Sequence, residues 1–200
     1  MKVLDEGAWT GINLDLSYEW THDNSILELE IQSALESKWQ GFLDISMSDW
    51  NDSPALVLTL NQIAYDSSCR PEIGKLKICN ADYGTTDWRG ITIVLLQGSQ
   101  IIASTIKLND FYSANDAWNQ YNVCHQLGHA FGLKHSEGNN CMATVTSQFP
   151  PEHPDQSNLD ELTELYQQET RQRDLEFGHR LPGHPAKGAQ GYRVEVHKVW

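Results

Sequence analysis

The sequence lacks any apolar run of the ~18–20 residues that a helix needs to span a bilayer. Its longest apolar runs, residues 91–97 and 101–106, have the length of strands. We therefore expect no membrane insertion. Hydrophobic residues make up 40% and charged residues 20% of the 200 positions, a balance typical of a globular chain rather than a disordered one.

Basic residues are also scarce, with 14 Lys and Arg against 27 Asp and Glu. Proteins that bind nucleic acid neutralise phosphates with clustered Lys and Arg, and no such cluster occurs here. We therefore expect no nucleic-acid partner. The acidity itself accounts for solubility and names no partner.

Cysteines are few, and no CxxC pair is present that would favour a zinc knuckle. The four cysteines fall as two pairs that are local in sequence, Cys69 with Cys79 and Cys124 with Cys141. We favour local disulfides and an oxidising compartment, with reduced cytosolic thiols as the alternative. The first residues contain no apolar signal segment, so for an exported protein we expect this sequence to be the processed form. The expected location is secreted or extracellular.

Periodicity predicts an α+β fold. Strand-like segments are expected at residues 12–20, 56–64, 76–79, 91–96 and 101–108, with a hairpin turn at Gly98 and Ser99. Helical spacing predicts helices at residues 26–45, 114–131 and 157–173. Residues 177–191 are expected to be irregular, and residues 192–200 alternate like a strand. We therefore expect one domain over residues 1–175 and an irregular extension, residues 176–200, that rejoins the sheet.

Three histidines carry the chemical signal. His125 and His129 are four residues apart, so on a helix they project from one face and can bind one metal ion. Gly132 is expected to end that helix and turn the chain, which lets His135 return as a third ligand. Three neutral imidazoles with an open fourth position are typical of catalytic zinc. The alternative interpretation is three unrelated histidines.

The segment His125-x-x-Gly128-His129-x-x-Gly132-x-x-His135 resembles the zinc-binding consensus of the metzincin metallopeptidases. Met142, seven residues after His135, matches the methionine of the Met-turn that lies beneath the zinc ligands in that family. Further segments are similar to a family of secreted bacterial matrixin-like proteins: Cys69-Arg70-Pro71, Ile78-Cys79-Asn80, the strand from Thr105 to Asp110, Ala117-Trp118 and Cys141-Met142.

The resemblance implies a metzincin-like fold: a twisted mixed sheet with an antiparallel edge strand, an active-site helix and a C-terminal helix. It implies that the edge strand, expected at residues 101–108, pairs with an extended peptide or protein substrate. It also supports a Cys124–Cys141 bridge between the zinc helix and the turn beneath it. We expect a monomer. A structural calcium ion is a family option; Asp44, Asp49 and Asp52 could line a loop, but without EF-hand spacing.

Two positions depart from the family pattern. Gln126 stands where the family has Glu, the general base that takes a proton from zinc-bound water. Thr144 stands where many metzincins have Tyr. Gln126 is open to three explanations: a natural pseudo-peptidase, an engineered Glu→Gln change, or a different carboxylate acting as the base, with Glu137 the nearest in sequence.

The resemblance thus implies a zinc-dependent metalloendopeptidase with Zn²⁺ on His125, His129 and His135, weakened at Gln126. The alternative is a non-catalytic pseudo-peptidase that binds zinc and extended peptides. A third class is a structural protein whose zinc site is closed by Cys141. The remaining histidines considered lie in polar context and are expected to be solvated, and the tryptophans are expected in the core: His153, His179, His184, His197; Trp9, Trp20, Trp39, Trp50.

Overall fold

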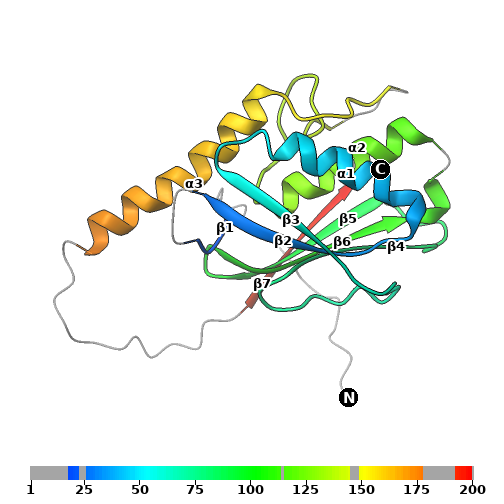
Figure 1. Cartoon of the computed structure of the whole chain (residues 1–200), viewed down its shortest axis with the longest axis horizontal. Coiled ribbons are helices and arrows are strands. Elements are labelled where there is room, and N and C mark those ends of the chain that lie inside the picture. The colour runs from blue at the N-terminus through cyan, green and yellow to red at the C-terminus, as the bar shows by residue number, and fades with distance from the viewer. Residues whose placement is uncertain (1–17, 23–25, 114, 145–148, 178–191, 200) are drawn as a thin grey trace, which may run out of the picture.

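A computed structural model describes residues 18–22, 26–113, 115–144, 149–177 and 192–199 (Figure 1). In this part of the chain no helix is both long enough and apolar enough to cross a bilayer. The expected α+β class is confirmed: three α-helices accompany one twisted mixed sheet.

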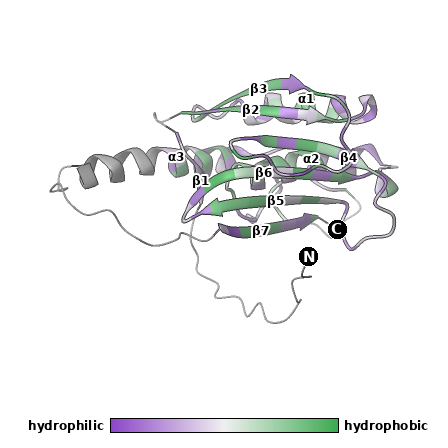
Figure 2. Cartoon of the chain, turned by 90° about the horizontal axis from the view of Figure 1, so that it is seen from below, coloured by the Kyte–Doolittle hydropathy of each residue, from purple (hydrophilic) through white to green (hydrophobic). Residues whose placement is uncertain are grey.

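Seven strands form the sheet within the described residues. In chain order they are β1 (Glu19–Trp20), β2 (Leu27–Ala34), β3 (Leu56–Gln62), β4 (Leu76–Ala81), β5 (Gly90–Gln97), β6 (Gln100–Asn109) and β7 (Tyr192–Val199). Their order across the sheet is β3-β2-β4-β6-β5-β7, with β1 pairing to β6 (Figure 2). The β2–β3, β2–β4, β4–β6 and β1–β6 pairs are parallel, whereas β5 runs antiparallel to both β6 and β7.

The helices are α1 (Ser37–Trp50), α2 (Asp116–Ala130) and α3 (Gln156–Phe177), with a short 3-10 helix at Asp110–Tyr112. The Asn115 side chain accepts a hydrogen bond from the backbone of Trp118 and so caps the start of α2. α2 packs on β5, β6 and β7 and against α1. Trp39 and Trp50 of α1 are buried, as expected, and the Trp50 indole donates to the Cys124 carbonyl of α2. Trp9 lies outside the described residues. The helix that carries the histidines therefore packs against both the sheet and α1.

The helix expected at residues 26–45 is wrong over its first half, because residues 27–34 form β2. Leu27, Leu29 and Ile31 point into the core, while Glu28 and Glu30 between them are exposed. This is a period of two, the signature of a strand with one buried face. The helix begins only at Ser37.

The expected edge strand is also wrong. Residues 101–108 belong to β6, which lies between β4 and β5 and pairs with both. The antiparallel strand beyond β6 is β5, joined to it by a tight turn at Gly98, whose φ is 66°. The hairpin at Gly98 is therefore confirmed. β7, expected from the alternation of residues 192–200, covers the outer edge of β5.

Both expected disulfides are present, Cys69–Cys79 and Cys124–Cys141. The first joins β4 to the loop before it. The second joins the middle of α2 to the segment that follows His135. The domain boundary expected at residue 175 stays a prediction, and residues 178–191 lie outside the described part of the chain.

Candidate metal centre

The histidine cluster forms at the C-terminal end of α2. His125 and His129 are 1% and 0% exposed and lie one turn apart on the helix. Gly132 then adopts a φ of 103°, and a Cβ at this position would lie 2.3 Å from the Tyr18 carbonyl oxygen. Only glycine combines that backbone conformation with so close an approach. The turn that it makes brings His135 back to the two helical histidines.

One nitrogen from each of His125, His129 and His135 lies within 4.8 Å of the other two. The Nε2 atom of His125 lies 2.9 Å from Nε2 of His129 and 3.2 Å from Nε2 of His135. The cluster of three is thus brought together as the spacing predicts. His135 is exposed, so the cluster is reachable from solvent on that side.

Backbone carbonyls fix the orientation of two rings. Nδ1 of His125 donates to the Cys141 carbonyl at 2.6 Å, and Nδ1 of His129 donates to the Leu133 carbonyl at 2.9 Å. A carbonyl oxygen can only accept, so the ring proton sits on Nδ1 in both residues. Their Nε2 atoms therefore face each other as lone pairs whenever the rings are neutral.

The rings are held neutral by burial. Burial lowers the pKa of His125 to about 3 and lowers the pKa of His129 well below its usual range, with nearby imidazoles acting in the same direction. Partial desolvation of the His135 ring also lowers its pKa. Neutral imidazole is the form that binds a metal ion.

Two of the nitrogen–nitrogen distances in the cluster are close to those around a tetrahedral zinc ion. With Zn–N bonds of ~2.0–2.1 Å, neighbouring ligand nitrogens of a tetrahedron lie about 3.3 Å apart. The contacts of 2.9 and 3.2 Å are close to this value. Lone pairs so close repel each other unless a cation lies between them. Histidines that bind a metal ion through one ring nitrogen usually donate from the other to a carbonyl or carboxylate, as Nδ1 of His125 and His129 does here.

Met142 lies beneath α2 and is fully buried. A Cβ at Gly128 would lie 2.2 Å from the Met142 sulfur and 3.0 Å from the Trp50 ring. Only a residue without a side chain therefore leaves room for the methionine at this point of α2. Asn140 holds the turn: its Oδ1 accepts from the Met142 backbone and from the Ser136 hydroxyl. The turn beneath the cluster is thus fixed by side chains as well as by the Cys124–Cys141 bridge.

Gln126 follows His125 on α2, is fully buried and points toward β5. The Thr92 hydroxyl lies 2.6 Å from Gln126 Oε1 and 3.0 Å from the Gln126 carbonyl oxygen and donates to these acceptors. Nε2 of Gln126 is buried and has no hydrogen-bond partner among the residues that the structure describes. An unmade hydrogen bond at a buried donor costs free energy.

The other candidates lie away from the cluster or add no ligand to it. Thr144 and Glu137 are exposed, and the group of converging ligand atoms contains no carboxylate. Asp44 accepts from the side chain of Gln40. The exposed His153 pairs with Asp49 at 2.7 Å. His179 and His184 lie outside the described residues.

His197 was expected to be solvated, and this is wrong. Its ring stacks on His129 with centroids 4.2 Å apart and an angle of 22° between the planes. Its Nε2 lies 2.5 Å from the hydroxyl of Tyr18, which precedes β1. Neither residue carried a local signal, because both reach the site through pairing between distant segments. An alternating strand that presents a single histidine was the only available sign.

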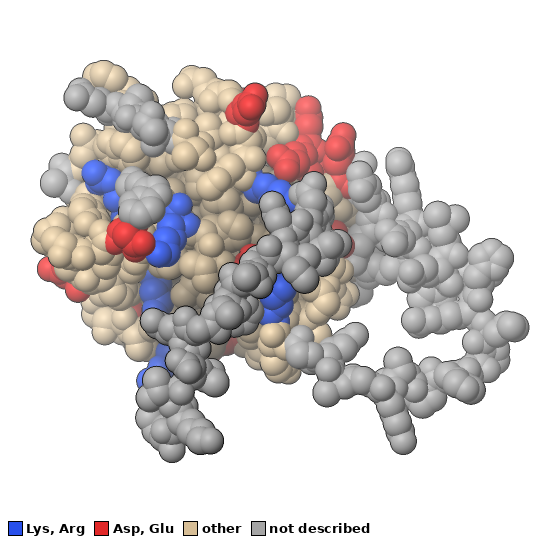
Figure 3. All heavy atoms as spheres, turned by 180° about the vertical axis from the view of Figure 1, so that it is seen from behind, with Lys and Arg blue, Asp and Glu red and all other residues tan. Residues whose placement is uncertain are grey.

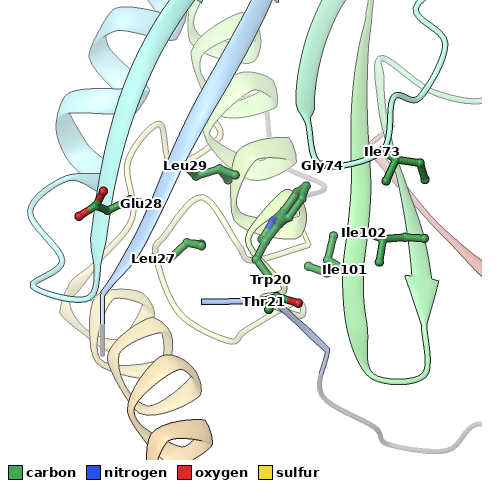
Figure 4. A pocket seen from close by; sticks show the side chains of 9 residues that line it. All are labelled: Trp20, Thr21, Leu27, Glu28, Leu29, Ile73, Gly74, Ile101 and Ile102. Carbon is green, nitrogen blue, oxygen red and sulfur yellow. The ribbon is translucent and has the colours of Figure 1, made fainter. Parts of the chain in front are cut away.

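A separate hollow of about 300 Å³ lies among the starts of β2 and β6, the end of β1 and the segment before β4 (Figure 4). Its walls are mostly apolar and include Trp20, Leu27, Leu29 and Ile101. It shares no residue with the histidine cluster.

On the face drawn in Figure 3, acidic and basic side chains are interspersed among uncharged ones.

No protein-family model matches the chain, and no curated protein matches it by sequence. Among solved structures, it is similar to high choriolytic enzyme 1, a hatching enzyme zinc-protease from the medaka fish Oryzias latipes. The TM-score is 0.42 at 10% identity, over 76% of this chain and 94% of that one.

Proposed function

We propose that the protein is a secreted zinc metalloendopeptidase of metzincin type with weakened turnover, in which His125, His129 and His135 hold one Zn²⁺. The observation that carries the proposal is the convergence of three neutral imidazoles, two of them with Nδ1 bound to a carbonyl and Nε2 turned inward. The metzincin-like spacing of these histidines and Met142 beneath Gly128 support the assignment. The two disulfides support an oxidising compartment.

A zinc ion held here would act as a Lewis acid on a peptide carbonyl and acidify a bound water. The carbonyls of Cys141 and Leu133 hold the two helical rings in the ligating tautomer. Gln126 can position a water or a peptide carbonyl by hydrogen bonding. Its amide has no useful basicity, so it cannot carry a proton as a carboxylate does. This is the reason for the weakened turnover.

The substrate class that fits is an extended peptide. β5 is antiparallel to β6 and packs against α2, so a peptide paired to its outer edge would pass the histidine cluster. Backbone pairing of this kind recognises an extended chain rather than a particular side chain. Unfolded proteins are therefore suitable probes.

A second candidate is a non-catalytic protein that binds zinc and peptides. The fully buried Gln126, bonded to Thr92, favours it, because the position of the general base holds a neutral side chain. The purely structural alternative is weaker. Cys141 is bonded to Cys124 and cannot close the fourth zinc position.

Zinc stoichiometry tests the proposal first. Protein refolded with zinc and desalted is expected to retain one ion per chain by mass spectrometry of metals. His129→Ala is expected to lose it, whereas His153→Ala, at an exposed histidine, is expected to keep it. Wild-type protein that retains no stoichiometric zinc would contradict the proposal. Chelator-sensitive cleavage of unfolded casein then separates the peptidase from the non-catalytic binder.

A further inference from the structure

The edge of β5 that faces the histidine cluster is already paired. β7 runs antiparallel to β5 in continuous register, from Gly90 opposite Val199 to Gln97 opposite Tyr192 (Figure 1). The Arg89 amide extends the pairing by donating to the Val199 carbonyl at 2.6 Å. A peptide could add to this edge only in the place that β7 now occupies.

The register sets one β7 side chain over the metal centre. His197 is opposite Thr92, and cross-strand partners lie on the same face of a sheet. Thr92 bonds to Gln126 on α2, so that face is the one covered by α2. His197 accordingly stacks on His129, a residue of the cluster. Its contact with the Tyr18 hydroxyl holds the ring there.

The two faces of β7 differ in an informative way. Arg193, Glu195 and His197 face the helix side and are half-buried. Val194 and Val196 are 55% and 49% exposed on the opposite face. A strand that turns its valines toward solvent gains little hydrophobic free energy from docking. Its attachment depends mainly on the backbone ladder, the burial of Val199 and the His197–Tyr18 contact, which suits a strand that can leave.

We propose that β7 is an intramolecular occupant of the peptide-binding edge of β5, with His197 seated over the histidine cluster, so that a peptide binds only when β7 is displaced. This rests on the proposed function, because the edge and the cluster are those of the proposed zinc site. Only molecules in which β7 has left the edge can bind a peptide. The apparent affinity for peptide is therefore the intrinsic affinity multiplied by the fraction of open molecules.

The test uses full-length, zinc-loaded protein and a fluorescein-labelled peptide with the sequence of residues 192–199. An intramolecular strand competes with an added peptide at an effective concentration set by its attachment to the same chain, so wild-type protein is expected to bind the peptide weakly. The variant Val194→Pro/Glu195→Pro removes a ladder donor whichever of the two amides points at β5. We expect it to bind the peptide about tenfold or more tightly than wild type by fluorescence anisotropy.

Three further variants sharpen the result. His197→Ala and Tyr18→Phe each break the contact over the cluster and are expected to raise peptide affinity by a smaller factor. The matched control, Val194→Thr/Val196→Thr, keeps the ladder and alters only exposed side chains, so its affinity should equal that of wild type. Hydrogen exchange at the β5 amides supplies a second readout, with faster exchange expected in the proline variant and restored protection when the peptide is added.

The outcomes separate this inference from the proposed function. If zinc is bound at one ion per chain but neither the proline variant nor His197→Ala binds peptide more tightly, β7 is a permanent strand and the inference is overturned. Loss of the cooperative unfolding transition in the proline variant overturns it too, because an exchangeable strand cannot be essential to the fold. If peptide binding rises while no variant holds zinc, the occupied edge stands and the zinc proposal fails.

Discussion

Replacing Gln126 by Glu is the most informative single change. The two side chains have the same shape, and the Thr92 hydroxyl, 2.6 Å from Oε1, can donate to a carboxylate as well as to an amide. The substitution also replaces the buried Nε2 donor, which has no described partner, by an acceptor. A general base typically contributes ~10²- to 10⁴-fold, which corresponds to about 3–5 kcal/mol of barrier height. We therefore expect chelator-sensitive cleavage to rise by that factor.

The assay is release of fluorescence from labelled, unfolded casein by zinc-loaded protein, with and without a chelator. Gln120→Glu is the matched control, because Gln120 is also buried on α2 but bonds to Ser46 of α1. It introduces the same charge without serving the cluster, and no gain in cleavage is expected from it. The measurement is repeated in the Val194→Pro/Glu195→Pro background, so that a blocked edge is not mistaken for missing chemistry.

Two results would refute the reasoning. A folded Gln126→Glu protein with one zinc ion and no gain in either background would show that position 126 is not the position of the base. Wild-type cleavage equal to that of the variant would show that another group takes the proton. The exposed Glu137 could then be tested by Glu137→Gln.

Two further predictions concern stability. Gly128→Ala should destabilise the fold by ~1–3 kcal/mol, because its new Cβ overpacks against Met142 and Trp50. Gly41→Ala has nothing within 4 Å of the new Cβ and should stabilise the fold by ~0.5–1 kcal/mol. Urea unfolding measures both free energies, and equal changes in the two variants would contradict the close contact at Gly128. Without metal, the free energy of unfolding should fall as the pH drops from about 6.5 toward 5, by up to about 1.4 kcal/mol per pH unit for His125. In this range His125 is protonated in the unfolded chain but stays neutral in the folded chain, where its pKa is about 3. His125→Asn should make the free energy of unfolding less dependent on pH. An unchanged slope in this variant would refute the attribution of the pH dependence to His125.

The histidine cluster was predictable because its determinants are local. The four-residue spacing on one helix and the turn at Gly132 bring His125, His129 and His135 together without any long-range contact. The strands with clear alternation or continuous apolar runs were predictable for the same reason. The errors came where one pattern fits two structures. Leu27, Ile31 and Ala34 have helical spacing, but Leu27, Leu29 and Ile31 also alternate with exposed glutamates, and pairing with β3 and β4 selects the strand.

Strand order and the position of His197 could not be read from the sequence. Both depend on which strands pair, and pairing between segments far apart leaves no mark on local periodicity. The sequence of β6 is compatible with an edge strand, but in the sheet β4 and β5 lie on its two sides. The sequence around His197 is typical of a surface strand, and only the pairing of β7 with β5 brings this histidine to the cluster.

Gln126 and β7 restrain the proposed reaction at different steps, and this makes their effects separable. Gln126 changes the barrier after a peptide is bound, whereas β7 changes the fraction of molecules that can bind one. If β7 exchanges readily, the gains from Gln126→Glu and from the proline variant multiply, because independent free energies add. If β7 stays closed on the timescale of the assay, the gain from Gln126→Glu appears only in the proline background. The double variant therefore reports whether access or proton transfer limits the wild-type protein.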